Sequence, residues 1–393
     1  SLQRMRRKEP SSAKMETLKI NKEIFCQRPA KCKLCGCIWP YQHSKFSRTV
    51  YDLKLFKGGI KRWIIRYKGA YYRCRECESS LMPDSYAVRT KGRYGRTLRA
   101  YVVYKIIAQN QSTSDVAEHL QELFGYYLQD DQIQRIKEYA AKHYMPTYQQ
   151  IPDKLRTGEL IHADETKITT RTGIGYVWAF ANMEEVLYIY ADTREGNILN
   201  EFLNGFSGVL VSDFYAAYDS VECAQQKCHI HLIRDINDAL QRNPFDEELK
   251  SLAEEYTKVL SPIIETIDRY GLKKYHLNKH KSQVDKFLKR ILDENYRSEN
   301  AQKFQQRFRK YKEKLFTFLD YDGVPWNNNN AEHMIKRIVK LRRRIKGVTT
   351  AKGSKEYLVL LSIYETLRLR NVSFLDFLVS GCLDIDEYVE RRR

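Results

Sequence analysis

Three strand-like runs in close succession constrain the fold of this chain more than any other feature. They cover residues 160–166, 176–181 and 186–191. Glycines at 173–175 supply a natural turn between the first two runs, so we expect a meander of strands. A short helix over 198–203 is expected next, followed by a buried strand in GVLVSD (208–213) and a shorter candidate strand over 227–231. Strands that give way to helices in this manner predict an α/β domain.

The order of these elements, three meandering strands, a helix and then strands alternating with helices, matches a ribonuclease H-like core. Ahead of it, residues 96–144 carry apolar side chains at helical spacing, N-cap residues at 112–115 and a break near Gly125. Three short helices with a tight break predict a helix-turn-helix-like unit, for which an ordinary helical bundle is the alternative.

An excess of basic side chains points to a polyanionic partner. Lys and Arg number 68 against 49 Asp and Glu, which gives a formal net charge of +19. Such a charge favours nucleic acid, or less often an anionic membrane, over the alternative of a merely basic protein. The chain has no run of eighteen apolar residues, and its basic start lacks the apolar core of a secretory signal, so we expect no membrane association.

Four of the nine cysteines form two CxxC pairs, Cys32 with Cys35 and Cys74 with Cys77. Each pair can present two thiolates from one turn, and four thiolates are a ligand set of tetrahedral Zn²⁺. We therefore expect one structural zinc ion, with disulfides as the poorer explanation. Cys37 could replace Cys35 if the first turn were shifted. The apolar runs between the pairs are short, which predicts only small strands there.

Two aspartates stand on strands that would be neighbours in the predicted sheet. Asp164 lies in the first strand and Asp213 ends the GVLVSD strand. Glu332 lies in the first turn of a helix expected from about 330 to 346, where helix capping is its simpler role. Carboxylates held on rigid elements suit two Mg²⁺ ions. Glu165 should face the opposite side from Asp164. Three further acids compete for the second position from loop-like or helix-like surroundings: Asp192, Asp219 and Asp235.

Several stretches of this chain resemble the catalytic region of IS66-type DDE transposases. They are IHADETKITT, GYVWAFANM, FLNGFSGVLVSDFYAAYDSV, CHIHLIRDI and NNNNAEHMIKRIV, and they occur in the same order from residue 159 to the last helix. Near the N-terminus, CKLCGC and YYRCREC are similar to the zinc-binding segment of that family.

This resemblance implies a bacterial insertion-sequence enzyme that cuts DNA at terminal inverted repeats and joins the 3′ hydroxyls to target DNA. Asp164 of DET, Asp213 of SDFYAAY and Glu332 of NNAE would form its catalytic triad and bind two Mg²⁺ (or Mn²⁺) ions. Double-stranded DNA, as transposon ends and as target, is the expected partner. Joining two ends requires a homodimer or a higher oligomer. The implied location is the bacterial cytoplasm, in association with the nucleoid.

Cys228 and His231 form a CxxH pair, and a similar pair recurs in DDE enzymes with a helical insertion between the second and third carboxylates. More than a hundred positions separate Asp213 from Glu332, so residues 233–322 are expected to be such an insertion. We expect the CxxH pair to brace the active site or a DNA end, because two ligands are too few for structural zinc. A small buried hydrophobe and a satisfied core histidine are the simpler roles.

A dense basic stretch follows Glu332, since residues 336–355 hold nine Lys or Arg and no acid. These cations would repel one another without a polyanion, so phosphate contacts are the expected use and a solvated helix face is the alternative. Trp326, in the preceding loop, could stack on a base or anchor the loop. The side chains expected to contact DNA are Trp326, Lys336, Arg337, Lys340, Arg342, Arg343, Arg344 and Lys346.

These expectations divide the chain into successive segments. They are a basic arm (1–25), a zinc-binding module (26–92), a helix-turn-helix-like DNA-binding domain (93–150), the first part of the ribonuclease H-like core (155–232), the helical insertion (233–322), the second part of the core (323–375) and a C-terminal tail (376–393). An active DDE transposase is the favoured function. The alternatives are an inactive or domesticated relative that only binds DNA, and a ribonuclease H-like nuclease that cuts without joining.

Overall fold

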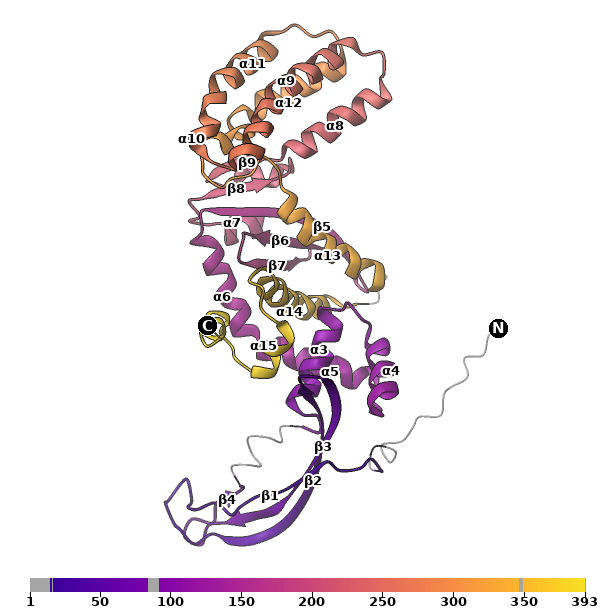
Figure 1. The fold of residues 1–393 in the computed structure, drawn as a ribbon, viewed down its shortest axis with the longest axis vertical. Helices are drawn as coiled ribbons and strands as arrows, with labels where there is room; N and C mark the ends of the chain where they lie inside the picture. Colours follow the sequence, from indigo (N-terminus) through magenta and orange to yellow (C-terminus); the bar gives the residue numbers. More distant parts are fainter. Residues whose placement is uncertain (1–14, 16, 84–91, 346–348, 393) are drawn as a thin grey trace, which may run out of the picture. The chain divides into compact units, whose positions relative to one another are not determined.

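The chain folds into two units in this computed structural model, which describes residues 15, 17–83, 92–345 and 349–392 (Figure 1). Unit 1 contains the chain up to Tyr144 together with Asn371–Arg393, and unit 2 is Met145–Arg370. Most of the predicted basic arm lies outside the described residues, as does Lys346. None of the helices in the described ranges combines the length and the apolar character that a membrane span requires.

Unit 1 begins with a four-stranded sheet built on a long hairpin. Its strands are β1 (Lys22–Phe25), β2 (Tyr41–Phe56), β3 (Gly59–Arg73) and β4 (Ser80–Leu81). β3 is central: it pairs with β1 in parallel and with β2 and β4 antiparallel. The prediction of only small strands here was wrong, because β2 and β3 have 16 and 15 residues. Only the middle of the hairpin has a buried face, at residues such as Val50 and Ile64, so its polar ends show no apolar pattern.

Three helices follow the hairpin, as the apolar spacing predicts. They are α3 (Arg96–Ile107), α4 (Thr113–Phe124) and α5 (Asp130–His143). Ser112 caps α4 in a capping box with Asp115, and Gly125 ends the helix in the left-handed conformation at φ 68°. The predicted N-cap residues and the predicted break are therefore confirmed.

The C-terminal residues form two helices of unit 1, α15 (Phe374–Ser380) and α16 (Ile385–Glu390). α15 packs on α3, and the Tyr144 hydroxyl donates to the Leu378 carbonyl at 3.1 Å. The hydroxyl of Ser373 and the carboxylate of Asp384 cap the two helices. These N-caps, followed by apolar side chains, are the signal in the sequence for helices in a segment that we had expected to be a tail.

Unit 2 is organised around a five-stranded mixed sheet in the order β7-β6-β5-β8-β9. The strands are β5 (Leu160–Thr170), β6 (Gly173–Ala181), β7 (Val186–Ala191), β8 (Val209–Ser212) and β9 (Ala224–Lys227). β5, β6 and β7 form the expected antiparallel meander, while β8 and β9 continue the sheet in parallel to β5. The first four predicted strands are therefore confirmed.

The fifth strand lies at Ala224–Lys227, so the prediction of a strand over 227–231 was wrong. This strand reads AQQK, yet Gln226 is fully buried. Its amide donates to the Leu315 carbonyl at 2.6 Å and accepts from the Phe318 N–H at 2.9 Å. Buried glutamines that bond to backbone groups have no apolar signature, so hydrophobic patterning could not find this strand.

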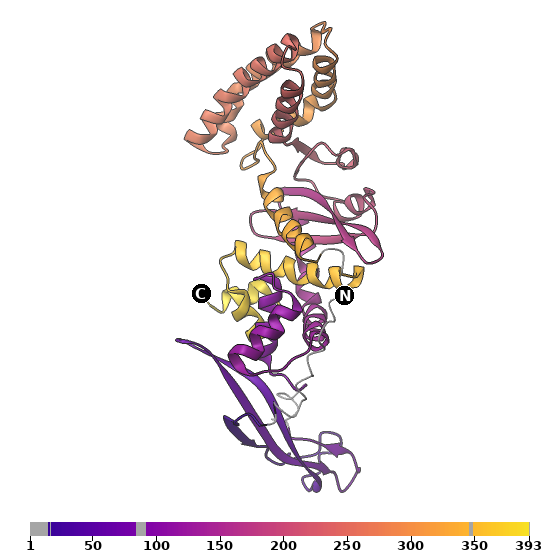
Figure 2. The same cartoon turned by 90° about the vertical axis from the view of Figure 1, so that its right-hand side faces the viewer.

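Helices fill the rest of unit 2. They are α6 (Met145–Arg156), α7 (Asn197–Phe202), the 3₁₀ turn η1 (Ala216–Ser220), α8 (His229–Arg242), α9 (Glu247–Tyr270), α10 (Lys274–Leu277), η2 (Asn278–His280), α11 (Lys281–Asp293), α12 (Glu299–Leu315), η3 (Thr317–Leu319), α13 (Asn329–Ile345) and α14 (Ala351–Leu369). Figure 2 shows α8 to α12 as a group of helices, coloured salmon to orange, at one end of unit 2 beyond the sheet. Their apolar faces share one core with Val209 and Val211 of β8.

The last two helices of unit 2 pack against the meander. α13 lies against β5 and β6, and α14 lies beside the edge strand β7 (Figure 1). Two backbone N–H groups of β7 donate to hydroxyls of α14: Tyr188 to Ser362 at 2.9 Å and Val186 to Thr366 at 3.0 Å. Because these groups have partners, the edge of the sheet is closed to further strands.

Candidate functional site

Asp164 lies within β5, and Asp213 directly follows the last residue of the neighbouring parallel strand β8. β5 and β8 pair with His162 opposite Val211, so the same register two residues later aligns Asp164 with Asp213. Each carboxylate is oriented by a nearby backbone N–H: Glu165 donates to Asp164 at 2.8 Å and Tyr215 donates to Asp213 at 2.9 Å. The two carboxylates are close enough for the charge of Asp213 to affect the pKa of Asp164.

The Asp164 carboxyl lies in a partly buried, negatively charged environment. Burial raises its pKa to about 8, and the negative charges of Glu165, Asp213 and Glu332 add to that rise. Like charges near one another disfavour the ionised form, and a divalent cation would remove that penalty. Carboxylate oxygens are hard donors of the kind that Mg²⁺ or Mn²⁺ prefers, so these residues fit such ions.

A clamp of asparagines fixes the start of α13 against β5. Asn328 is fully buried; its side chain donates to the Ala163 carbonyl at 2.8 Å and accepts from the His162 ring at 3.0 Å. Asn330 lies 3.3 Å from the other nitrogen of the same ring. By itself, the run of asparagines indicates only a loop. Its repeated amide groups are the signal for a segment that binds a strand backbone.

Glu332 lies in the first turn of α13 and faces the CxxH pair. Its Oε1 is 3.7 Å from the Nδ1 of His231, and one ligand atom from each of Cys228, His231 and Glu332 lies within 4.8 Å of the others. Among the described residues, Asp164, Asp213 and Glu332 do not meet as closely as this cluster does. The fold thus brings Glu332 within electrostatic reach of Asp164, while its carboxylate contacts Cys228 and His231.

Cys228 is the N-cap residue of α8, and its sulfur accepts a hydrogen bond from the Asn328 N–H at 3.2 Å. Burial raises the pKa of this thiol, against the effect of backbone N–H groups from His231, Asn328 and Ile230. A residue and its third successor share one side of the first helical turn, which explains why Cys228 and His231 point to the same place.

Glu165 has partners of its own, which sequence reasoning missed. It accepts hydrogen bonds from Arg194 at 3.1 Å and from the Tyr218 hydroxyl at 2.7 Å. Burial raises the pKa of Glu165, and Arg194 and Tyr218 oppose that rise. The Arg194 guanidinium also lies over the Tyr215 ring at 3.9 Å. A carboxylate that is paired with an arginine is less available to a metal ion. Asp164 is therefore a better candidate metal ligand than Glu165.

Two of the rival aspartates are held in ion pairs. Asp219 pairs with the fully buried Lys227 at 3.2 Å and with Lys310 at 2.9 Å, and Asp235 pairs with Arg307 at 2.6 Å. Burial lowers the pKa of Lys227 to about 8. Asp192 is exposed. These partners give Asp219 and Asp235 structural roles.

The basic stretch on α13 divides into an exposed face and side chains engaged within unit 2. Lys336, Lys340 and Arg343 are exposed at helical spacing, opposite the buried Met334, Ile338 and Leu341. The exposed trio faces solvent along one side of the helix.

The other basic side chains on α13 have partners inside the unit. Arg337 bonds to the fully buried Glu365 at 2.8 Å and to the Tyr364 hydroxyl at 3.2 Å. Arg342 donates to the Lys167 carbonyl at 3.2 Å, and Arg344 lies over the Tyr357 ring at 5.8 Å. These contacts attach α13 to α14 and to β5.

Trp326 packs against the core shared by β8 and the helical group. Its ring centroid is 6.3 Å from that of His229, and its carbonyl accepts from the His229 N–H at 3.0 Å. Of the two roles that the sequence allows, this packing favours a loop anchor.

The four cysteines of the two CxxC pairs meet in unit 1, with their sulfur atoms all within 4.8 Å of one another. Cys32 and Cys77 are 3.6 Å apart, and Cys35 and Cys74 are 3.4 Å apart. Zinc–sulfur bonds of about 2.3 Å place the corners of a tetrahedron about 3.8 Å apart, so the cluster fits Zn²⁺. The Ser79 hydroxyl and backbone N–H groups lower the pKa of Cys32 to about 6. Cys37 is outside the cluster.

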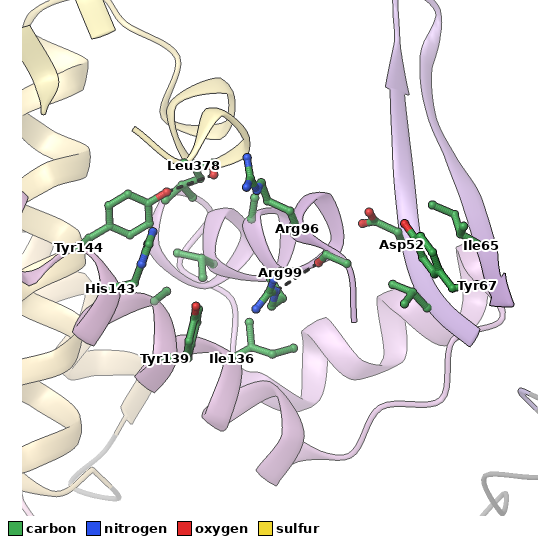
Figure 3. A pocket seen from close by; sticks show the side chains of 16 residues that line it. Asp52, Ile65, Tyr67, Arg96, Arg99, Ile136, Tyr139, His143, Tyr144 and Leu378 are labelled. Carbon is green, nitrogen blue, oxygen red and sulfur yellow. Dashed lines mark hydrogen bonds between the residues drawn. The ribbon is translucent and has the colours of Figure 1, made fainter. Parts of the chain in front are cut away.

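A cavity of about 840 Å³ lies inside unit 1 between α3, α5 and the hairpin (Figure 3). Several of its polar side chains contact groups within unit 1. The Asp52 carboxylate accepts from the Leu98 N–H at 2.8 Å, and Tyr139 lies between the Arg99 guanidinium at 5.2 Å and the stacked His143 ring at 5.9 Å. We therefore interpret these contacts as structural: they attach the hairpin to the helices of unit 1.

Comparisons with known proteins show which family and which other protein this chain is similar to. A family model described as "Transposase IS66 family" matches residues 91–356. That match includes both aspartates, the CxxH pair and Glu332, and it begins after the cysteine cluster. The chain is also 21% identical over 396 residues to "Uncharacterized protein y4hP" of Sinorhizobium fredii (strain NBRC 101917 / NGR234), covering 89% of this chain and 69% of that protein.

Proposed function

Because the chain belongs to the IS66 transposase family, which implies an enzyme that acts on DNA, we propose that unit 2 carries a DDE active site. Asp164, Asp213 and Glu332 are its metal ligands. The site cleaves DNA at transposon ends and transfers the 3′ hydroxyls to target DNA. The observation that carries this proposal is the electrostatic proximity of three acids: Asp164 on β5, Asp213 just after the parallel strand β8, and Glu332 on the helix whose start Asn328 fixes against β5.

The strand arrangement supports a ribonuclease H-like core. An antiparallel meander followed by two parallel strands, with the central strand contributing one acid and its parallel neighbour the next, is the arrangement expected from the sequence. We propose that this core consists of residues 155–232 and, from the predicted second part 323–375, of the residues that lie in unit 2 (323–370). Residues 233–322, which contain α9 to α12, would be a helical insertion. Residues 26–92 would be the zinc-binding module and 93–150 the helix-turn-helix-like domain.

The chain's own residues divide the chemical work. Asp164 and Asp213 would hold two Mg²⁺ or Mn²⁺ ions, which when bound activate the attacking oxygen and stabilise the leaving oxygen. Asn328 fixes the start of the helix that carries Glu332. Arg194, held by Glu165 next to Asp213, offers a partly exposed guanidinium for a phosphate of the DNA.

Phosphate contacts from α13 would orient double-stranded DNA at the site. Lys336, Lys340 and Arg343 present three positive charges on the exposed side of the helix that begins with the Glu332 turn. Two transposon ends must meet the target together, so we propose that the active form contains at least two chains.

Strand transfer with defined DNA ends tests the proposal. The full chain is incubated in Mg²⁺ with oligonucleotides that carry the inverted repeats flanking its coding region and with a target plasmid. We expect joined products from the wild type and from Asp192→Asn, an exposed acid, and none from Asp213→Asn. Joining by Asp213→Asn would contradict the proposal. Binding without cleavage by the wild type would favour a DNA-binding relative, and cleavage without joining would favour a nuclease.

A further inference from the structure

A second set of metal-ligating side chains adjoins the carboxylates, where α8 and α13 begin. Cys228 caps α8, His231 lies in the first turn of that helix, and Glu332 lies in the first turn of α13. One sulfur, one nitrogen and one oxygen atom from these residues lie within 4.8 Å of one another. This is one of two such groups among the residues that the structure describes, and the other is the four-cysteine cluster.

The distances fit a small ion at the centre of the cluster. Zinc bonds of about 2.0 Å to nitrogen or oxygen and about 2.3 Å to sulfur place tetrahedral corners roughly 3.3–3.6 Å apart. The observed separation of 3.7 Å between His231 Nδ1 and Glu332 Oε1 is close to that value. Both of these atoms are buried and have no hydrogen-bond partner within the described chain. Polar atoms that are buried without a partner are uncommon and call for a ligand.

The donor set selects the class of ion. A thiolate, an imidazole and a carboxylate suit Zn²⁺, whereas Mg²⁺ prefers oxygen donors alone. Three protein ligands also leave one position of a tetrahedron open, which is the arrangement of zinc sites that bind a further water or substrate atom. The N–H of Asn328 donates to the Cys228 sulfur, and this hydrogen bond favours the thiolate form that a metal ion binds.

We propose that Cys228, His231 and Glu332 bind one Zn²⁺ ion. This site is distinct from the four-cysteine site in unit 1, and it uses a carboxylate that the proposed Mg²⁺ site also requires. If the proposed function is correct, Zn²⁺ at the cluster and Mg²⁺ beside Asp164 and Asp213 would be coupled through Glu332. Only this coupling rests on the proposed function. The competing explanation is an ion pair between a protonated His231 and Glu332, with Cys228 as a buried thiol.

Metal content of the full-length protein tests the proposal without DNA or turnover. After purification with Zn²⁺ and removal of loosely bound metal, we expect two zinc ions per chain in the wild type and in Cys382→Ser, whose thiol lies outside both clusters. Cys228→Ser and Glu332→Gln should each retain one ion, or bind the second at least about tenfold more weakly. Thermal unfolding and circular dichroism identify variants that have lost their fold.

Cobalt substitution provides a second measurement in case Cys228→Ser does not fold. Co²⁺ added to the wild type should fill a four-sulfur site and a second site with a single sulfur ligand, and Glu332→Gln should change only the second spectrum. One zinc per wild-type chain, or a Co²⁺ titration identical for wild type and folded Glu332→Gln, would overturn the proposal in favour of the ion pair. Neither result depends on whether the protein transfers DNA strands.

Discussion

The two clusters that the sequence singles out, four cysteines in unit 1 and three acids in unit 2, are assembled in opposite ways. Each CxxC pair is made by one local turn, so the hairpin has only to bring two turns together. The acids come from a strand, a strand end and a helix far along the chain, and the other two come within electrostatic reach of Asp164 only when the sheet and α13 have formed. The four-cysteine cluster therefore needs only a small part of unit 1 to be folded, whereas the position of the three acids depends on the whole fold of unit 2.

The two sites also differ in what they do to stability. The four cysteines could close around one ion, and binding of that ion would contribute to folding directly. Burial, together with the negative charges of neighbouring acids, raises the pKa of Asp164 to about 8 and makes its ionised form unfavourable. The comparison therefore predicts that unit 1 requires its metal for stability, while unit 2 gives up stability to keep an open site for chemistry.

Removing a zinc ligand should have the largest effect. Cys74→Ser is expected to lose the zinc of unit 1 and to unfold the sheet around it, because zinc binding in small domains supplies about 10–16 kcal/mol. Zinc content and limited proteolysis of residues 17–83 measure the loss. Cys37→Ser is the matched control, since Cys37 lies in the same turn but outside the cluster. Zinc loss in Cys37→Ser together with retention in Cys35→Ser would shift the ligand set to Cys37.

A substitution at Asp219 tests whether this alternative candidate for the second acid stabilises the fold and has no part in catalysis. Asp219→Asn should lower the free energy of unfolding by about 3 kcal/mol, because it leaves the buried Lys227 without its carboxylate partner. Urea denaturation measures this change, and Lys227→Met in the same background should recover part of it. Asp235→Asn, whose partner is on the surface, should change stability by no more than about 1 kcal/mol. Strand transfer should survive in Asp219→Asn at a temperature where it is folded, and its complete loss there would make Asp219 a rival for catalysis.

The exposed face of α13 should control DNA affinity. Replacing Lys336, Lys340 and Arg343 with Gln is expected to reduce the slope of log K against log salt by about 2–3, because each phosphate contact releases counterions. Fluorescence anisotropy over a range of salt concentrations measures the slope. Lys286→Gln with Lys289→Gln, exposed on α11, serves as the control. If the slope fell equally in both variants, DNA affinity would depend on net charge alone and not on this face of α13.

The smallest effect is a gain in stability. Asp164→Asn should raise Tm by on the order of 2–5 °C at pH 8 without added Mg²⁺. The folded state holds the Asp164 proton up to a pKa of about 8, whereas the unfolded chain releases it near 4, so wild-type stability falls as pH rises between these values. The gain should shrink towards pH 4, and Asp192→Asn should show none. If Asp164→Asn had a lower Tm than the wild type at pH 8, burial and neighbouring negative charges would not destabilise the ionised Asp164 carboxylate as described.

Much of unit 2 could be predicted because its buried strands are apolar and its acids follow them. GVLVSD identifies both β8 and Asp213, and the run before Asp164 identifies β5. β9 escaped detection because its buried glutamines satisfy backbone groups instead of avoiding water. The asparagine clamp, the Arg194–Glu165 contact and the packing of α15 on α3 depend on partners far away in the sequence. No local pattern specifies such a partner, so these features needed three-dimensional structure.

The measurement that bears most directly on the central claim is metal rescue at Asp213. Asp213→Cys replaces a hard oxygen ligand with a soft sulfur ligand, which Mg²⁺ accepts poorly and Mn²⁺ accepts better. We predict that this variant transfers strands at least about 10³-fold more slowly than the wild type in Mg²⁺ and regains part of that loss in Mn²⁺. Wild-type activity of Asp213→Cys in Mg²⁺, or an equal deficit of the folded variant in both metals, would contradict a role for Asp213 as a catalytic metal ligand.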